Sequence, residues 1–483
     1  MMTSFAILTL GCKVNQYESQ QIRQLLESCG LRLVDLADSP ELVVVNSCCV
    51  THTASAKSRH LLHQAGKQNP QAIILCGCLP AAPTGELTVV GENIHVVKDR
   101  CELPATLSRL ARTESTTPDS NHPATTVIRP QNDAKVKSKN DLHPDQDLPA
   151  LASFHGQTRA FLKIQDGCDG PCLYCIIPTV RPVVRFRNPG EILAEARALV
   201  AAGHKEIVIT GVHVGAYGQT TARRRRWSTD ENPHLADLLD KVAQVPGLAR
   251  VRVSSLDPAD VTPRLLDVFG YHPNLMPHLH LSLQSGSDAV LRRMARPYSA
   301  DEFRTKVALV KDRLDRPAIT TDIIVGFPGE TDAEFEETVA LAREVGFAKM
   351  HVFAFSPRKG TAAATMRPQV APPVIKARSK TLRDLDRDLQ TRFRAQFLGE
   401  TAQVLIEESA DGSPAGRAER YFEVRIGRGT DKTNRTDRTG VSEGRARESY
   451  PSESSYSPGE IVAVRLDQNS RDAVLATAIP QIA

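Results

Sequence analysis

The sequence Cys168-Asp169-Gly170-Pro171-Cys172-Leu173-Tyr174-Cys175 places three thiols in one short loop with the spacing CxxxCxxC. The loop follows the apolar stretch 160–164, which predicts a β-strand. A cubane iron–sulfur cluster has four irons and is normally held by four thiolates. A loop that supplies only three therefore predicts a cluster with one iron free to bind a reactant.

Two other interpretations of this loop are open. It could be a structural zinc knuckle completed by a fourth Cys or His, or its cysteines could simply pack in a core. No partner CxxC and no HxxxH lies within zinc-finger range of the loop. Three thiols crowded among Gly and Pro rarely serve packing, so the cluster is favoured.

The chain has 483 residues, which at about 150 residues per domain predicts roughly three domains. Its hydrophobic content of 41% is ordinary for a globular protein. We see neither a basic signal region nor an apolar run of membrane-spanning length, so a cytoplasmic protein without a membrane partner is expected. Ten cysteines then favour metal or redox use over disulfides. The net charge of +4 permits nucleic-acid binding without requiring it.

The first third of the chain alternates between apolar runs and helical patterns. Strands are predicted over 5–10, 42–45 and 72–75, and helices over 18–29 and 54–68. This alternation is typical of a βαβαβ unit with a parallel sheet between layers of helices.

One cysteine follows each of these three strands, namely Cys12, Cys48 and Cys78. Ligands of open parallel sheets gather outside the carboxyl ends of the strands, so the three thiols should face one another. This predicts a second cluster with an open iron. Buried cysteines at strand ends are the alternative, and a register error of one residue would replace Cys48 by its neighbour. The remaining cysteines are interpreted as packing residues: Cys29, Cys49, Cys76 and Cys101.

These motifs together resemble the radical S-adenosylmethionine (SAM) methylthiotransferase family. The resemblance is carried by Gly11-Cys12-Lys13-Val14-Asn15-Gln16-Tyr17-Glu18-Ser19, Asn46-Ser47-Cys48, Gly77-Cys78 and the CxxxCxxC loop. The segment 13–19 is similar to the branch that acts on N6-threonylcarbamoyladenosine in tRNA, beside the anticodon. The resemblance covers most of the chain outside three polar stretches.

The resemblance implies two [4Fe-4S] clusters, one on Cys168, Cys172 and Cys175 and one on the N-terminal trio. It also implies two SAM molecules per turnover: one gives a 5'-deoxyadenosyl radical that takes hydrogen from C2 of the adenine, and one gives the methyl group. A flavodoxin- or ferredoxin-type electron donor is implied, while the sulfur donor is left open. No side-chain acid or base is assigned, and the catalytic residues stay unknown.

Other functions are kept as alternatives. Within the same chemistry, the substrate could be N6-isopentenyladenosine in tRNA or an aspartate of a ribosomal protein. From another class, the chain could be a non-catalytic iron–sulfur regulator that binds RNA.

Six strand–helix units follow the cluster loop and predict a partial (βα)6 barrel. The expected strands are 160–164, 206–210, 250–253, 278–281, 318–325 and 349–355. Capping signatures open three of the helices, at Asn188–Glu191, Ser299–Glu302 and Thr331–Glu334. Chemistry in such barrels lies at the carboxyl ends of the strands.

The SAM contacts are implied by the resemblance. Thr210 and Gly211 should approach the methionine ammonium, and Tyr174 and the segment 324–328 should lie near the adenine. Ordinary turn chemistry is the alternative explanation of such residues. Arg181-Pro182 stands where the family commonly has Arg-Gly, and it is expected to touch no ligand. The predicted SAM-binding set is Tyr174, Thr210, Gly211, Ser255, Gln284, Gly326 and Pro328.

Two further regions are candidates for RNA contact. The inserted loop 219–233 carries Arg223 to Arg226 followed by Trp227, which could grip phosphates and stack a base, or be merely solvated. Near the carboxyl end, a helix over 373–397 precedes strands at 401–406, 421–426 and 460–466, which predict a small antiparallel barrel.

The predicted small barrel resembles the TRAM domain, an RNA-binding module. Its basic residues alternate with aromatic ones, as phosphate contact and base stacking require, although a solvated face is the competing explanation. These residues are Arg417, Arg420, Arg425, Tyr421 and Phe422.

The sequence thus predicts an α/β protein of three domains and a connecting helix. Its parts are an N-terminal methylthiotransferase domain (1–110), a flexible linker (111–150), the radical SAM partial barrel (151–372), the helix (373–397) and a TRAM-like domain (398–483) with a polar insertion (427–457).

Overall fold

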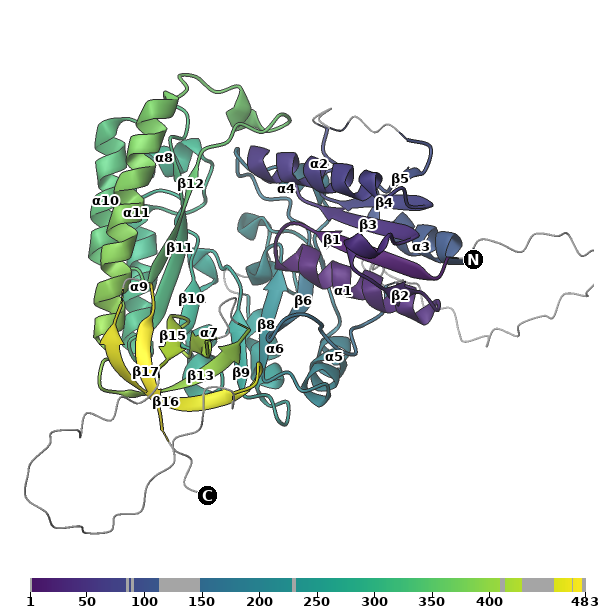
Figure 1. Cartoon of the computed structure of the whole chain (residues 1–483). Coiled ribbons are helices and arrows are strands. Elements are labelled where there is room, and N and C mark those ends of the chain that lie inside the picture. The colour runs from purple at the N-terminus through teal and green to yellow at the C-terminus, as the bar shows by residue number, and fades with distance from the viewer. Residues whose placement is uncertain are drawn as a thin grey trace, which may run out of the picture.

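The computed structural model describes residues 2–83, 87, 91–112, 148–227, 232–408, 413–427, 456–470 and 472–479. Most of the predicted linker and of the polar insertion lies outside these residues. An N-terminal sheet domain stands beside a split barrel, and a small closed barrel lies beneath (Figure 1). The expected α/β fold class is confirmed. None of the described helices has both the length and the apolar character that crossing a membrane requires.

The N-terminal domain has three layers around a five-stranded parallel sheet with the order β2-β1-β3-β4-β5. Helices α1 and α3 cover one face and α2 covers the other, because the sheet residues alternate between two apolar clusters. The elements are β1 (Ser4–Thr9), α1 (Lys13–Ser28), β2 (Arg32–Leu33), β3 (Leu42–Ser47), α2 (His52–Lys67), β4 (Ala72–Gly77), β5 (Ile94–Val96) and α3 (Leu103–Arg112). The predicted start of the first helix at residue 18 is wrong, since α1 begins directly after Cys12.

All six predicted barrel strands are present, but they form two sheets. The first has the order β7-β6-β8-β9 and the second the order β10-β11-β12. Isolated parallel bridges join them, pairing Val251 with Leu275 and Leu256 with Leu281. The strands are β6 (Ala160–Asp166), β7 (Arg185–Phe186), β8 (Glu206–Gly211), β9 (Arg250–Val253), β10 (His278–His280), β11 (Ala318–Val325) and β12 (Lys349–Ala354).

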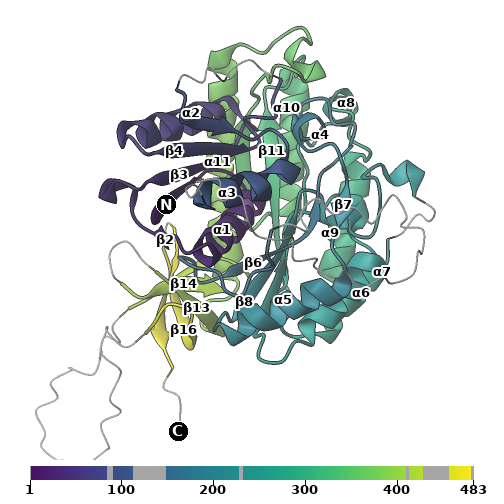
Figure 2. The same cartoon turned by 90° about the vertical axis from the view of Figure 1, so that its right-hand side faces the viewer.

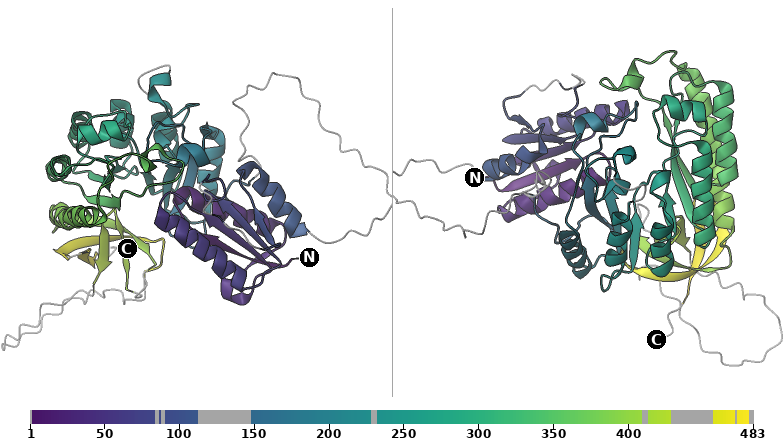
Figure 3. Two further views of the ribbon diagram at one scale, coloured as in Figure 1. Left: turned by 90° about the horizontal axis from the view of Figure 1, so that it is seen from above. Right: turned by 180° about the vertical axis from the view of Figure 1, so that it is seen from behind.

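Helices cover the outside of both barrel sheets (Figures 2 and 3). Full capping boxes begin α9 at Ser299 and α10 at Thr331, as predicted. The box predicted at Asn188 is wrong, because that side chain accepts from the amide of Gly190 instead. The helices are α4 (Ile177–Val180), α5 (Pro189–Ala201), α6 (His234–Ala243), α7 (Pro263–Tyr271), α8 (Asp288–Arg293), α9 (Ala300–Arg313), α10 (Asp332–Val345) and α11 (Pro372–Ala395).

The C-terminal domain is a closed barrel with the order β13-β14-β15-β17-β16. Its neighbouring strands are antiparallel except β15 and β17, which pair in parallel. Sequence patterns identified β13, β15 and β16 but missed β14 and β17. The strands are β13 (Thr401–Glu407), β14 (Ala415–Ala418), β15 (Glu423–Ile426), β16 (Ile461–Asn469) and β17 (Val474–Ala478).

Two buried arginines of β9 fasten this small barrel to the larger one. The guanidinium of Arg250 donates to the carbonyls of Arg417 and Gln403, at 2.9 and 2.6 Å. Arg252 donates to the carbonyls of Glu419 and Ala418, both at 2.8 Å. These bonds satisfy carbonyls of the small barrel at its interface with the larger one.

The aromatic pair of the small barrel is also used inside the protein. The ring of Tyr421 stacks on His278, with centroids 4.5 Å apart, and Phe422 stacks on Phe397 at 5.7 Å. Arg420 donates to Asp315 at 2.8 Å. Both rings thus have partners within the protein, and the stacking of RNA bases on them stays a prediction.

Glu206 of β8 is the counter-ion of both interface arginines, and it is fully buried. It accepts from Arg252 at 2.8 Å and lies 3.6 Å from Arg250. We expect Glu206→Ala to lower the free energy of unfolding by about 3 to 5 kcal/mol, because it leaves buried guanidinium charge without a partner. Urea denaturation followed by far-UV circular dichroism measures this. The exposed control Glu336→Ala should lose less than about 0.5 kcal/mol, and an equal loss in the two variants would contradict the assignment.

Candidate active site

The CxxxCxxC loop emerges from β6 and folds back on itself. The amide of Cys168 donates to the carbonyl of Arg181 at 3.0 Å, and the amide of Cys175 donates to the carbonyl of Cys172 at 3.1 Å. Burial, with the neighbouring Cys172 and Cys168 thiols, raises the pKa of Cys175 to about 12. The three thiols, which we call the barrel triad, are thus held together at the carboxyl end of the strand.

Positive groups face the barrel triad. Arg296 donates to the Cys172 sulfur at 3.1 Å, which favours the thiolate form that a metal needs. The pKa of His213 is raised to about 9: burial opposes its charged form, but a hydrogen bond to Cys168 and the carboxylates of Asp257 and Asp260 outweigh burial. Neither Arg296 nor His213 was predicted, because both come from other strand–helix units and carry no local motif.

The N-terminal triad of Cys12, Cys48 and Cys78 gathers at the carboxyl edge of the other sheet. Cys12 lies at the N-cap of α1, Cys48 follows β3 and Cys78 follows β4. Burial, with the neighbouring Cys78 and Cys12 thiols, raises the pKa of Cys48 to about 11. The structure therefore brings together the three residues that the sequence singled out.

The remaining cysteines of the N-terminal domain have other surroundings. The thiol of Cys49 contacts the carbonyl of Cys78 at 3.4 Å and packs in an apolar cluster with Leu79 and Ile176. The structure therefore favours Cys48 over Cys49 as the member of the triad. Cys76 is buried and Cys29 packs against the core of the domain. Cys101 is exposed, and its predicted packing role is wrong.

The spacing of the thiols bears on what each triad could hold. Among the described residues, the three sulfur atoms of neither triad all lie within 4.8 Å of one another. Three thiolates on one zinc ion, each at about 2.3 Å, would lie about 3.8 Å apart. A four-iron cluster is larger than a single ion and needs three well-separated thiolates, so the donor set fits the cluster better than zinc.

A buried arginine links the two triads. Arg181 follows the barrel triad, and its guanidinium donates to Glu18 at 2.8 and 2.9 Å and to Asp166 at 2.7 and 2.9 Å. It also donates to the Asn15 side chain at 3.1 Å. Glu18 and Asn15 belong to α1, the helix that begins beside Cys12. The expectation that Arg181 contacts none of the proposed cluster ligands is wrong, since its backbone carbonyl accepts a hydrogen bond from the amide of Cys168.

Two further cations complete this network. Arg100 lies 3.5 Å from Glu18 and 3.6 Å from the Cys78 sulfur, and the Lys163 ammonium lies 3.6 Å from Glu18. Burial alone would raise the pKa of Glu18, but Arg181, Arg100 and Lys163 outweigh it and lower the pKa to about 2. The network keeps positive charge beside the N-terminal triad.

The predicted SAM contacts lie at or after the carboxyl ends of five strands, β6 and β8 to β11. Tyr174 and Ile324 pack on one apolar cluster with Phe327, as the expected adenine environment requires. Gly326 serves packing instead: its amide donates to Glu330 at 2.6 Å, and a Cβ there would lie 2.4 Å from Ile375 of α11. The others are placed as follows: Thr210 and Pro328 are buried, Gly211 ends β8, Ser255 is exposed after β9, and Gln284 forms an isolated parallel β-bridge with Ile323.

A cavity of about 290 Å³ occupies the inside of the barrel, between β8 to β12, α1 and the small barrel. Among the predicted SAM contacts, only Ser255 lines it. Six of its other polar groups come from alternate residues of three strands, which point to the same side. These are His278 and His280 of β10, Thr320 and Asp322 of β11, and Lys349 and His351 of β12. In the sequence, polar residues at every second position of a barrel strand were the pattern that could have indicated this cavity.

The inserted arginine loop packs against the barrel triad. Thr221 and the amide of Ala222 donate to the Asp169 carboxylate at 2.6 and 2.7 Å, and Arg223 donates to the Asp169 carbonyl at 2.8 Å. Arg224 pairs with Asp260 and covers the Trp227 ring. Part of the loop, residues 228–231, lies outside the described residues. Its described part thus supports the cysteine loop, and the hypothesis of RNA contact gains nothing from it.

Comparison with known proteins agrees with this site. The profile of the radical SAM superfamily matches residues 162–342, and that of the uncharacterized protein family UPF0004 matches residues 4–98. The threonylcarbamoyladenosine tRNA methylthiotransferase MtaB of Bacillus subtilis is 35% identical, over 84% of this chain and 86% of its own. The protein of the same name from Chlamydia pneumoniae is 37% identical, over 87% and 90%.

The chain belongs to the radical SAM methylthiotransferase family. Family members use SAM and two [4Fe-4S] clusters. The tRNA-2-methylthio-N(6)-dimethylallyladenosine synthase of Thermobifida fusca is 34% identical, over 91% of this chain and 84% of its own, so identity separates the two tRNA branches only slightly. A radical SAM methyltransferase, TsrM from Kitasatospora setae, shares the fold alone, with 14% identity, a TM-score of 0.50 and coverage of 75% and 74%.

The Arg181 network makes a testable link between the triads of this methylthiotransferase. We expect Arg181→Met to lower the free energy of unfolding by about 3 kcal/mol, at the lower end for a broken buried pair because Lys163 and Arg100 remain. Iron bound per chain after anaerobic reconstitution should fall as well. Urea denaturation and iron analysis measure the two effects. The exposed Arg197→Met of α5 is the control, and wild-type iron content in Arg181→Met would contradict the link.

Proposed function

We propose that this methylthiotransferase converts N6-threonylcarbamoyladenosine, next to the anticodon of tRNA, to its 2-methylthio derivative. The observation that carries the proposal is the pair of cysteine triads joined by Arg181. The substrate is supported by the relatives named for this activity, which match along most of their length.

The residues divide the work by position. When bound, the clusters and SAM supply the radical, sulfur and methyl chemistry. Cys168, Cys172 and Cys175 hold one cluster and the N-terminal triad holds the other. The Arg181 network fixes the separation of the triads, and the barrel positions the substrate. Tyr174, Thr210, Gly211, Ser255, Gln284, Gly326 and Pro328 remain the proposed SAM environment, with Gly326 acting through the packing of α11.

The proposal also includes an electron donor and a cellular location. An electron donor of flavodoxin or ferredoxin type would reduce the barrel cluster, and a cytoplasmic location follows from tRNA as substrate. The sulfur source is not part of the proposal.

Analysis of tRNA nucleosides by mass spectrometry tests the substrate. A strain that lacks the gene should lose 2-methylthio-N6-threonylcarbamoyladenosine and accumulate the unmodified form, with recovery on expression of the chain. An unchanged level in the deletion strain would refute the substrate. Loss of methylthio-isopentenyladenosine instead would favour the alternative tRNA substrate.

Single cysteine variants test the division between the triads. Cys12→Ala should still release 5'-deoxyadenosine from SAM and dithionite but should not methylthiolate RNA, whereas Cys172→Ala should lose both activities. Anaerobic assays of the reconstituted full chain measure both products, with Cys101→Ala as the exposed control. Full methylthiolation by Cys12→Ala would sink the two-cluster proposal, and a wild type that releases no 5'-deoxyadenosine would favour the non-catalytic regulator.

A further inference from the structure

The barrel cavity is strongly basic. Four cationic side chains line it, Lys13, Arg159, Arg252 and Lys349, against a single carboxylate, Asp322. Two of these cations have partners outside the cavity: Arg159 pairs with Glu407 at 2.9 Å, and Arg252 pairs with Glu206 at 2.8 Å. Asp322 lies 3.3 Å from the imidazole of His280.

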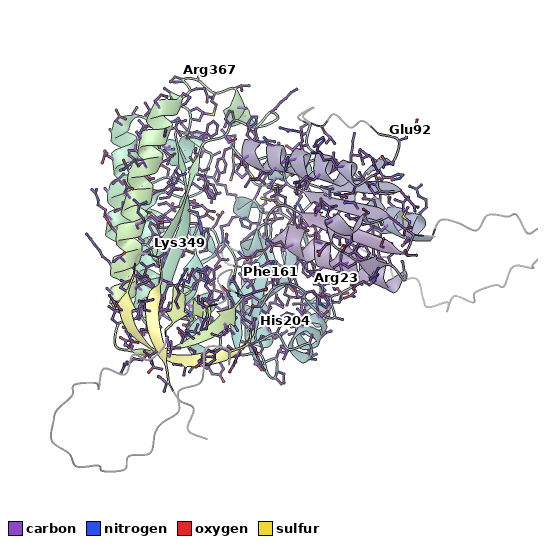
Figure 4. The ribbon with its side chains drawn as sticks, viewed as in Figure 1. Arg23, Glu92, Phe161, His204, Lys349 and Arg367 are labelled. Atoms are coloured by element: carbon purple, nitrogen blue, oxygen red, sulfur yellow. The ribbon has the colours of Figure 1, made fainter. Side chains whose placement is uncertain are left out.

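The two lysines are different. Neither the Lys13 nor the Lys349 ammonium has an ion pair or a hydrogen bond within the described part of the chain, although both side chains are half-buried. Lys13 is the first residue of α1 and directly follows Cys12 in the N-terminal domain. Lys349 is the first residue of β12 in the second barrel sheet, and Figure 4 labels it. A half-buried ammonium without a partner is costly, so the pair is suited to an anionic ligand.

The imidazoles of the cavity agree with this charge. Burial lowers the pKa of His278, and Arg252, His280 and Lys13 lower it in the same direction. The pKa of His351 is lowered too, because burial, His280, Lys349 and Lys13 together outweigh the opposing Asp322 carboxylate. The Nδ1 atom of His278 is buried without a hydrogen-bond partner among the described residues. The cavity therefore resists further positive charge and keeps a polar atom unused.

A divalent cation is the competing ligand. His280, Asp322 and His351 bring their ligand atoms within 4.8 Å of one another. The surrounding lysines and arginines disfavour a cation there, because like charges in a cavity repel strongly. The same imidazoles can instead hydrogen-bond an anion or its neighbouring hydroxyl group.

The substrate of the proposed function supplies such an anion. The threonylcarbamoyl group carries a carboxylate and a hydroxyl, whereas an isopentenyl group is apolar and would leave both ammonium groups desolvated without a partner. We propose that Lys13 and Lys349 bind the carboxylate of the N6-threonylcarbamoyl group in this cavity, and so make the enzyme prefer it to N6-isopentenyladenosine. The inference rests on the proposed function.

The route into the cavity fits this arrangement. A larger hollow of about 810 Å³, between α1, the start of β6 and the small barrel, shares Lys13 and Arg159 with the barrel cavity. An anticodon loop in the outer hollow could pass its modified base between these two residues. Lys13 directly follows Cys12, so a carboxylate on Lys13 holds the base close to the N-terminal triad.

The experiment compares substrates with and without this charge. Reconstituted full-length enzyme is assayed anaerobically on anticodon stem–loops that carry threonylcarbamoyladenosine, its neutral methyl ester, or isopentenyladenosine. The wild type should prefer the acid to the ester by about 10- to 100-fold in kcat/KM, as expected for a charge-assisted bond. In Lys349→Met and Lys13→Met this ratio should fall to nearly one, and in the exposed control Lys241→Met it should stay.

Each other outcome has a definite meaning. If the wild type does not act on the threonylcarbamoyl stem–loop, the proposed function fails. If it does so but treats acid and ester equally, or if the lysine variants keep the ratio, only the carboxylate site fails. Equal losses on all three substrates would assign the lysines to RNA phosphates, which also overturns the inference. The wild-type comparison decides even if a lysine variant does not fold.

Discussion

One buried guanidinium holds the two halves of the active site in register. Arg181 belongs to the barrel segment, yet one of its two carboxylate partners, Glu18, lies on the helix that begins directly after Cys12. Charges without water need partners in good geometry, so this network tolerates little displacement. The hydroxyl of Tyr17 on the same helix bonds Glu195 of the barrel at 2.9 Å, which adds a second fixed point. Two triads from distant parts of the sequence thus become a single site.

The small C-terminal barrel contributes to this site from below. Its Tyr421 stacks on His278 and lines the cavity, while Arg252 holds its strand-end carbonyls. The ring of Tyr421, which the sequence assigned to RNA stacking, forms part of the cavity wall. The cavity is consequently a product of all three domains, and none of them encloses it alone.

Much of the fold followed from local patterns, because strands of the barrel are apolar runs of ordinary length and thiols after strands must meet at one edge. The short strands β2, β5, β14 and β17 gave too little pattern to detect. Long-range partners were beyond such reasoning: Arg181, Arg296 and His213 act on thiols far away in the sequence. The use of Tyr421 could not be foreseen either, since the same basic and aromatic pattern suits RNA or a domain interface.

The structure separates the reaction from the choice of substrate. In the proposed function, the thiol triads and their cations serve the methylthiolation itself, which is common to both tRNA branches. Choice must then come from the groups that meet the N6 substituent. A polar site rejects an apolar substrate far more strongly than an apolar site rejects a polar one, because its own groups are left unpaired. A few charged positions in the barrel can therefore change the substrate within a family whose tRNA branches are almost equally similar to this chain.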